Sequence, residues 1–273
     1  MTWTVRQRAM LEEMGVRLWA HSIPRRSADV QASALPPATQ GQAGASPARV
    51  EAAPQPPSIM DDHAAAVLAD RPIGNRPPGI ATMDWPALRD AVASCTACGL
   101  CRSRTNTVFG TGHLRAQWMI VGEAPGEQED LRGEPFVGKS GQLLDSMLRA
   151  VQLTRSDDVP ARQVYIANTL KCRPPANRNP EPGELVQCEP YLVRQIELVR
   201  PGIILAMGRF AVQALLRSNE PVGRLRGRVH VYQGVPLVVT YHPAYLLRNP
   251  QDKARAWDDL CLARAVVQGS KSV

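Results

Sequence analysis

Aromatic side chains make up only 5% of this chain of 273 residues, and none stands between Ala20 and Asp84. Ten of the 24 prolines fall in that stretch, where Ala, Gln, Gly and Ser fill the gaps. Such a composition buries too little apolar surface to offset the entropy that folding costs. We therefore predict a disordered linker over 22–85, between a short helical segment over 1–21 and one folded domain over 86–268.

Long apolar runs are also absent. No stretch approaches the roughly 18 apolar residues of a membrane span, and the first residues lack the core and cleavage pattern of a secretory signal. We therefore expect a cytoplasmic protein that makes no contact with a membrane. In that reducing compartment the six cysteines, all at or after Cys95, are expected to be thiols or metal ligands rather than disulfides.

Net charge is missing from the first part of the chain, because eight arginines and eight acidic residues cancel over 1–85. The net charge of +7 therefore falls on 86–273, which favours a polyanionic partner, although many basic proteins bind no nucleic acid. Lysine is rare, with four in the chain. Lys139 is the one expected at the pocket, and no desolvated base partner is evident to activate it, which argues against a lysine that forms a Schiff base.

After Trp85, short apolar runs alternate with helical patterns. This alternation predicts an α/β fold, a three-layer α/β/α sandwich around a central, mostly parallel four-stranded sheet. We expect strands at 117–122, 164–168, 203–207 and 235–241, and helices at 140–151, 184–199, 209–217 and 251–267. Ligands of such sheets bind beyond the carboxyl ends of the strands. Because Glu123, Asn168 and His242 each follow a strand, we expect them to share one site.

Four cysteines are arranged in two pairs. Cys95 and Cys98 form a C-x2-C motif, and Cys172 and Cys188 lie in a loop rich in Pro and Arg and in the helix that follows it. Four thiolates suit zinc or an iron–sulfur cluster, and the spacing alone does not choose between them. Cys101 extends the first pair and is a rival ligand. The alternative to metal binding is that the cysteines are simply buried as small apolar residues. This alternative fits Cys261 better than it fits a C-x2-C motif followed by Gly.

Five sequence blocks carry a family resemblance, and they stand in order between about residues 86 and 267. The blocks are CTAC at 95–98, GEAPGEQED at 122–130, PFVGKSGQLLD at 135–145, NTLKCRPPANRNP at 168–180 and YHPAYLLRNP at 241–250. Together they resemble the bacterial family 4 uracil-DNA glycosylases, which carry an iron–sulfur cluster. Residues 1–85 lie outside the resemblance and form an N-terminal extension.

This resemblance implies a uracil-DNA glycosylase-like fold for 86–268 and a monofunctional enzyme that hydrolyses the N-glycosidic bond of uracil in DNA, which starts base excision repair. The substrate would be single- or double-stranded DNA, and we expect the enzyme to be a monomer associated with the nucleoid. The resemblance also implies a [4Fe–4S] cluster with four cysteine ligands. These ligands are Cys95, Cys98, Cys172 and Cys188.

Roles for individual residues follow from the resemblance. His242 would donate a hydrogen bond to uracil O2 as the base leaves as an anion, and Asn168 would pair with its N3–H and O4. Phe136 would stack on the base. Glu123 would orient water or stabilise the cationic sugar, and Glu129 would block the methyl group of thymine. The alternatives are a turn-capping His, a turn Asn, a core Phe and solvated glutamates.

The remaining assignments concern backbone and DNA contacts. Gly122 and Ala124 would bring the backbone close to the substrate, and amides at Gly138 and Gly141 would lie near a phosphate at the start of the next helix. Leu246 would fill the gap that the flipped base leaves. The residues expected to contact DNA are Gly138, Lys139, Ser140, Leu246 and Arg248.

Two other functions fit parts of the sequence. A non-catalytic or covalently trapping binder of uracil-DNA would be expected to carry an inserted basic loop with a His after the glycine-rich segment, and this chain has none. A replication-associated scaffold with a metal site is supported only by the N-terminal extension. Both alternatives are weaker than a normal glycosylase, because the GEAPG motif is present.

Residues 1–25 carry a prediction of their own. Apolar residues at near-helical spacing precede Trp19, and the segment looks like the N-terminal part of the clamp-loader psi subunit, which binds the chi subunit. We expect deletion of 1–25 to leave activity on short oligonucleotides intact and to abolish pull-down of the chi subunit or the single-strand-binding protein, because the linker acts as a tether. Loss of activity on free oligonucleotides would instead mean that the segment packs on the catalytic domain.

Overall fold

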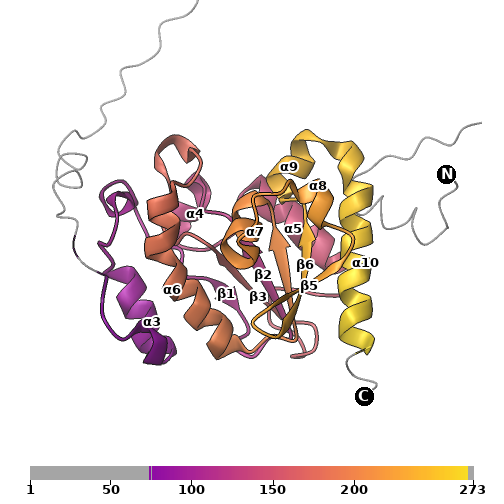
Figure 1. Cartoon of the computed structure of the whole chain (residues 1–273), viewed down its shortest axis with the longest axis horizontal. Helices are drawn as coiled ribbons and strands as arrows, with labels where there is room; N and C mark the ends of the chain where they lie inside the picture. Colours follow the sequence, from indigo (N-terminus) through magenta and orange to yellow (C-terminus); the bar gives the residue numbers. More distant parts are fainter. Residues whose placement is uncertain (1–73, 75, 270–273) are drawn as a thin grey trace, which may run out of the picture.

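A computed structural model describes residue 74 and residues 76–269, and its centre is one six-stranded sheet (Figure 1). The order across the sheet is β1-β3-β2-β4-β6-β5. The strands are β1 (Thr111–Gly112), β2 (Trp118–Gly122), β3 (Val164–Asn168), β4 (Ile203–Met207), β5 (Val229–Tyr232) and β6 (Val235–Thr240). Within this part of the chain, no helix has the length and apolar character needed to cross a membrane.

The four predicted strands form the middle of this sheet, and they are parallel to one another. Their residues are almost all buried, which is why continuous apolar runs in the sequence predicted these strands. The prediction of four strands was nevertheless incomplete, because β1 and β5 extend the sheet antiparallel at its two edges. β1 has only two residues, and β5 exposes Val229 and Val231, so neither gives the pattern of a buried strand.

Helices cover both faces of the sheet, as the three-layer prediction requires. On one face, α5 (Lys139–Ala150) and α10 (Lys253–Gly269) pack on Ile120, Leu205 and their neighbours. On the other face, α6 (Pro182–Val199) and α7 (Arg209–Leu216) pack on side chains such as Val121. Successive side chains of each strand thus enter opposite cores. Figure 1 shows α6 and α10 on opposite sides of the sheet.

The start of the described chain packs on α6. The helix α3 (Trp85–Ala93) begins at Asp84, whose side chain accepts a hydrogen bond from the backbone N–H of Ala87 at 3.0 Å. Ile80 is buried in the same cluster as Tyr191 of α6. The boundary predicted at residue 85 was therefore too late, since 76–84 belong to the folded part. The helical segment predicted over 1–21 and the linker up to residue 73 lie outside the described residues.

Short helices complete the architecture and carry the loops around the sheet. Three of them are α-helical: α4 (Glu127–Arg132), α8 (Val222–Leu225) and α9 (Pro243–Arg248). Four are 3-10 helices: η1 (Ile80–Thr82), η2 (Gly99–Arg102), η3 (Pro175–Asn177) and η4 (Pro250–Asp252).

The helix α9 corrects one residue assignment. Leu246, the predicted wedge, has 0% exposed surface and lies in the core beneath α9. A side chain held there does not reach into a base stack, so the structure contradicts the wedge role for Leu246. The next residue, Leu247, is 43% exposed.

We expect Leu246→Ala to lower the free energy of unfolding by about 2–5 kcal/mol, because it leaves a cavity in a close-packed core. Its neighbour provides a matched control, since Leu247→Ala removes the same atoms from the surface and should change stability by less than about 0.5 kcal/mol. Urea unfolding curves of both variants measure the difference. Equal losses in the two variants would show that α9 does not pack in this way.

Candidate active site and cysteine site

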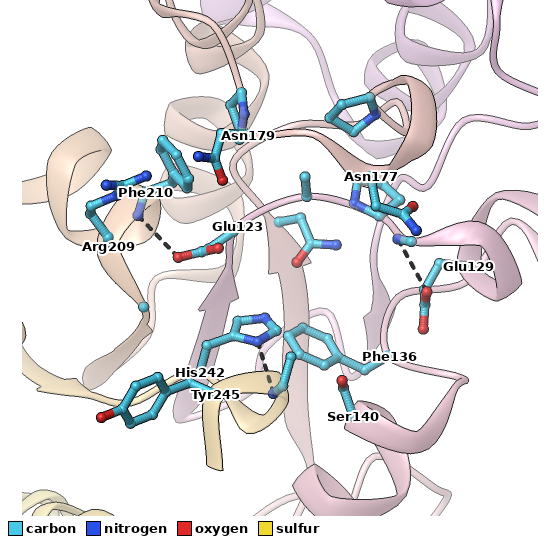
Figure 2. A pocket seen from close by; sticks show the side chains of 18 of the residues that line it. Glu123, Glu129, Phe136, Ser140, Asn177, Asn179, Arg209, Phe210, His242 and Tyr245 are labelled. Atoms are coloured by element: carbon cyan, nitrogen blue, oxygen red, sulfur yellow. Dashed lines mark hydrogen bonds between the residues drawn. The ribbon is translucent and has the colours of Figure 1, made fainter. Parts of the chain in front are cut away.

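A cleft of about 930 Å³ opens at the carboxyl ends of the four parallel strands. Gly122 pairs with Asn168 and Met207 pairs with Thr240, so the residues that follow these strands meet at one edge. Glu123, Asn168 and His242 all line the cleft, as predicted, and Figure 2 labels Glu123 and His242 within it. The other predicted residues that line it are Ala124, Glu129, Phe136, Gly138, Lys139, Ser140 and Arg248.

The loops after β2 and β3 are joined by hydrogen bonds beyond the ends of the strands. Thr169 N–H donates to the carbonyl of Gly122 at 3.0 Å, and Leu170 N–H donates to that of Glu123 at 3.1 Å. The hydroxyl of Thr169 donates to the same carbonyl of Glu123 at 2.5 Å. These bonds fix the backbone of Glu123 relative to Asn168.

Glu123 is held by the backbone at the start of α7, a contact that the sequence did not predict. Phe210 N–H donates to Glu123 Oε1 at 3.3 Å (Figure 2). Burial raises the pKa of this carboxyl above its usual value, while the amides of Phe210 and Arg209 oppose the shift. Gly208 has φ +90°, and a Cβ there would lie 2.4 Å from Oε1. The sequence feature that could have indicated this contact is Gly208, a glycine between a buried strand and a helix.

His242 caps the start of α9 with its side chain. Its Nδ1 accepts a hydrogen bond from Ala244 N–H at 3.1 Å, so the neutral ring carries its proton on Nε2. Burial, together with the positive charge of Arg248, lowers the pKa of His242 to about 4, against an opposing effect of Glu129. At neutral pH the site therefore holds an uncharged imidazole whose Nε2–H is a donor.

Asn168 presents an unused acceptor. The residue is 2% exposed, and its buried Oδ1 has no hydrogen-bond partner within the described part of the chain. Buried acceptors without partners are costly and call for a ligand or water. Gly122 makes room for this group, because a Cβ there would lie 2.4 Å from Asn168 Oδ1 and 2.5 Å from Phe136 Cζ.

Phe136 has a conformation that is unusual for an aromatic residue, with φ +56°. Its ring lies beside that of His242, with centroids 5.4 Å apart and planes at 28° (Figure 2). Gly141 permits the close approach of this loop to α5, because a Cβ at Gly141 would overlap the carbonyl group of Phe136. In this conformation the Phe136 ring forms part of the cleft wall, beside His242.

Glu129 joins two loops of the site. Its Oε1 accepts from Val137 N–H and Gly138 N–H, both at 2.9 Å, and its Oε2 accepts from Gly126 N–H at 3.1 Å. The amide of Gly138 is therefore occupied, as is that of Gly141, which donates to the carbonyl of Gly138. The predicted phosphate contact through these two amides is contradicted by the structure.

Cationic and acidic side chains both line the cleft, and the cations include Lys139, Arg209 and Arg248. Arg178 also lines it, but its guanidinium binds the carboxylate of Glu184 through two hydrogen bonds of 3.0 and 2.6 Å. Three cationic side chains are thus placed around the opening where a phosphate backbone would pass.

A second, small cavity is lined by five cysteines. Cys95 follows α3 and Cys98 precedes η2, while Cys172 follows β3 and Cys188 lies within α6. The elements that form the cavity thus come from two distant parts of the chain. Cys101 lines it as well, so the structure keeps this residue as a rival ligand.

Hydrogen-bond donors surround the sulfur atoms. Arg104 Nη1 donates to Cys172 Sγ at 3.0 Å, and Lys171 N–H donates to Cys188 Sγ at 3.2 Å. Burial raises the pKa of the Cys172 thiol to about 11 and that of Cys188 to about 12. Thiols with such pKa values stay protonated at neutral pH unless a metal displaces the proton.

The sulfur donors of this cavity are the kind that zinc or an iron–sulfur cluster takes. No three Cys, His, Asp or Glu side chains among residues 74 and 76–269 converge closely enough to hold one metal ion. A [4Fe–4S] cluster binds each thiolate through a different iron, so its ligands need not converge on one point. The buried Tyr191 hydroxyl, which has no hydrogen-bond partner in the described part, lies beside Cys95 and is available to a ligated sulfur.

Comparison with known proteins agrees with this geometry. The family model described as the uracil DNA glycosylase superfamily matches residues 109–261. The chain is 44% identical to the type-4 uracil-DNA glycosylase of Archaeoglobus fulgidus, over 59% of this chain and 81% of that protein. It is 41% identical to the Thermotoga maritima type-4 enzyme, over 61% and 84%, and 40% identical to that of Pyrobaculum aerophilum, over 66% and 93%.

The geometry of His242 predicts a neutral imidazole. Because its pKa falls from 6.5 to about 4 on folding, the unfolded chain binds the proton more strongly, and stability decreases as pH falls from 6.5 towards 4. NMR of protein labelled at the histidine rings should show His242 protonated only on Nε2 at pH 7 and still neutral at about pH 5. The His242→Gln variant identifies its signals. A midpoint near 6.5 would contradict the buried, neutral donor.

Proposed function

The chain belongs to the type-4 uracil-DNA glycosylases of the uracil DNA glycosylase superfamily, and from this premise we propose that the cleft at the ends of the parallel strands is its active site. The enzyme hydrolyses the N-glycosidic bond of uracil in DNA, which starts base excision repair. The observation that carries the site assignment is the buried, unpartnered Oδ1 of Asn168 at the cleft.

Asn168 selects the base in this proposal. Its Oδ1 accepts from N3–H of uracil, and its Nδ2 donates to O4. Cytosine has no proton on N3 and carries an amino group in place of O4, so both contacts fail. Phe136 stacks on the flipped base, and Gly122 keeps the space between these two side chains open.

The base leaves as the C1′–N1 bond breaks and takes the electron pair with it. Negative charge then grows on uracil O2, to which the Nε2–H of His242 donates a hydrogen bond. A neutral donor suffices, and the Nδ1 contact with Ala244 keeps the proton on the correct nitrogen. Preorganised donors of this kind act strongly because the site is largely shielded from water.

Glu123 acts on the sugar side of the bond. Its carboxylate stabilises the positive charge that develops on the deoxyribose and orients the water molecule that adds to C1′. The start of α7 holds the carboxylate through Phe210 N–H. Ala124 brings backbone close to the substrate, and Glu129 holds the adjoining loops so that thymine, with its methyl group, is excluded.

DNA contacts are proposed for the rim residues. Lys139, Ser140 and Arg248 line the mouth of the cleft and bind phosphates. Leu247, which is exposed on α9, takes the wedge role that Leu246 is too buried to perform. The enzyme is monofunctional in this proposal and leaves an abasic site without cutting the strand, because no group in the described part of the chain is placed to activate Lys139 as a Schiff-base nucleophile.

A [4Fe–4S] cluster on Cys95, Cys98, Cys172 and Cys188 is the proposed cofactor. It supplies a structural link between α3, the loop after β3 and α6, remote from the reacting bond. We also propose that the protein acts as a monomer on nucleoid DNA in the cytoplasm. A clamp-loader chi subunit remains the proposed partner of residues 1–25.

Two substitutions test the active site. His242→Ala should lower the single-turnover rate on uracil-containing single-stranded DNA by about a hundredfold or more, because a preorganised donor to the leaving anion is lost. Asn168→Asp should relax discrimination against cytosine, since a carboxylate accepts from its amino group. Abasic-site formation is the measurement, and His113→Ala, outside the cleft, is the matched control. An unchanged rate in His242→Ala would remove His242 from the site.

The ligand set has its own test. Cys172→Ala and Cys188→Ala should each lose iron and the broad absorption near 400 nm, because three cysteines hold a [4Fe–4S] cluster poorly. Cys261→Ala, on the exposed side of α10, should keep both. Iron analysis of the purified proteins gives the result. Parental iron content in Cys188→Ala would overturn the ligand set and favour Cys101 in its place.

A further inference from the structure

Lys171 is a buried cation between the cleft and the cysteine site, and neither the base contacts nor the cluster ligation accounts for it. The residue is 1% exposed. Its Nζ donates to the backbone carbonyl of Asn168 at 2.8 Å and to Gln195 Oε1 at 2.6 Å. Its backbone N–H donates to Cys188 Sγ, and its carbonyl accepts from Val108 N–H at 2.7 Å. One residue thus contacts both sites.

Gln195 of α6, the side chain that accepts from the Lys171 ammonium, is neutral and fixed in orientation. Gln195 is fully buried, and its Nε2 donates to the carbonyl of Phe109 at 2.9 Å and to the Tyr165 hydroxyl at 3.0 Å. Those two contacts leave Oε1 for the ammonium of Lys171. Within residues 74 and 76–269, no carboxylate lies within 4.0 Å of this ammonium.

A charge in such a place needs compensation, because a buried cation without an anion is strongly disfavoured. Cys188 and Cys172 are the nearest groups that would become anionic on metal binding, since Cys188 Sγ accepts from the Lys171 N–H at 3.2 Å and Cys172 is the next residue. Four thiolates around a [4Fe–4S] core of two positive charges leave two net negative charges. Lys171 and Arg104, which is 4% exposed and bonded to Cys172, are two buried cations beside them.

The contact with Asn168 lies where base recognition is set. Asn168 is the last residue of β3, and Thr169 N–H holds the neighbouring backbone to Gly122. The ammonium of Lys171 binds the Asn168 carbonyl from the side of the cysteine cavity. This contact anchors the backbone at the end of β3, from which the Asn168 carboxamide projects, so its loss would let that backbone shift.

We propose that Lys171 is a positioning residue that couples the cysteine site to the base-reading side chain of Asn168. The inference rests on the proposed function of the cleft. Thiolates that hold a cluster would favour the ammonium in the interior, and the ammonium anchors the backbone of Asn168 in the position from which its carboxamide reads uracil. Damage to the cluster is thereby transmitted to base recognition.

The test uses the full-length, iron-loaded protein and its Lys171→Met variant. Binding of free uracil, followed by ligand-observed NMR, reports on the pocket without turnover. We expect Lys171→Met to bind uracil and to cleave uracil-DNA roughly tenfold to a hundredfold less well than the parent, with uracil selected less sharply over cytosine. Lys171→Arg, which keeps the charge, should recover part of the loss. Lys253→Met removes another buried lysine, on α10, and should match the parent.

Three outcomes would overturn the proposal. Parental uracil binding in Lys171→Met would do so, whether iron is retained or lost, because the pocket would then not depend on the ammonium. If Lys171→Met is insoluble, Gln195→Glu gives the ammonium a carboxylate partner that competes with the Asn168 carbonyl, and unchanged uracil binding there has the same meaning. Equal losses in Lys171→Met and Lys253→Met would indicate general damage to the fold.

Failure of the proposed function gives a different result. A parent protein that forms no abasic sites on uracil-DNA refutes the glycosylase assignment, whatever the variants do. An active parent with an equally active Lys171→Met refutes only the coupling.

Discussion

The register between β2 and β3 determines the geometry of the site. The strands pair from Trp118 and Val164 to Gly122 and Asn168, and hydrogen bonds continue beyond them to Glu123 and Leu170. Glu123, proposed to act on the sugar, and Asn168, proposed to read the base, therefore lie on one ladder. A shift of one residue would turn these side chains to the opposite face of the sheet. The cysteine loop continues from the same ladder, so both sites depend on it.

Burial controls the chemistry of the groups attached to this frame. It lowers the pKa of His242 to about 4 and raises that of Glu123, so shielding from water favours the uncharged form of each. The protein offsets the effect at Glu123 with the amides that begin α7 and leaves His242 neutral. In the proposed mechanism, a neutral donor for the leaving base and a supported carboxylate for the sugar match the charges that develop when the bond breaks.

The four central strands could be predicted because each is a short, continuous apolar run, and parallel pairing then brings Glu123, Asn168 and His242 together. The strand β4 was predicted with the correct bounds, but the contacts that follow it were missed, since Gly208 and Phe210 act through backbone rather than through recognisable side chains. Leu246 and Leu247 are adjacent and chemically identical, and only the rotation of α9 distinguishes the core residue from the surface one. The amide of Gly138 was misassigned because Glu129, nine residues earlier, occupies it.

The helix α6 has a further consequence for how the chain assembles. It carries Cys188 and Gln195 on one side, while Cys95 comes from a segment synthesised much earlier. A metal that joins them closes a long loop and, by analogy with a cross-link of that span, removes about 4–5 kcal/mol of chain entropy from the unfolded state. Cys188 also precedes β6 and His242 in synthesis. During translation, the residues of the cysteine site are therefore all made before β6, the last strand that forms the cleft.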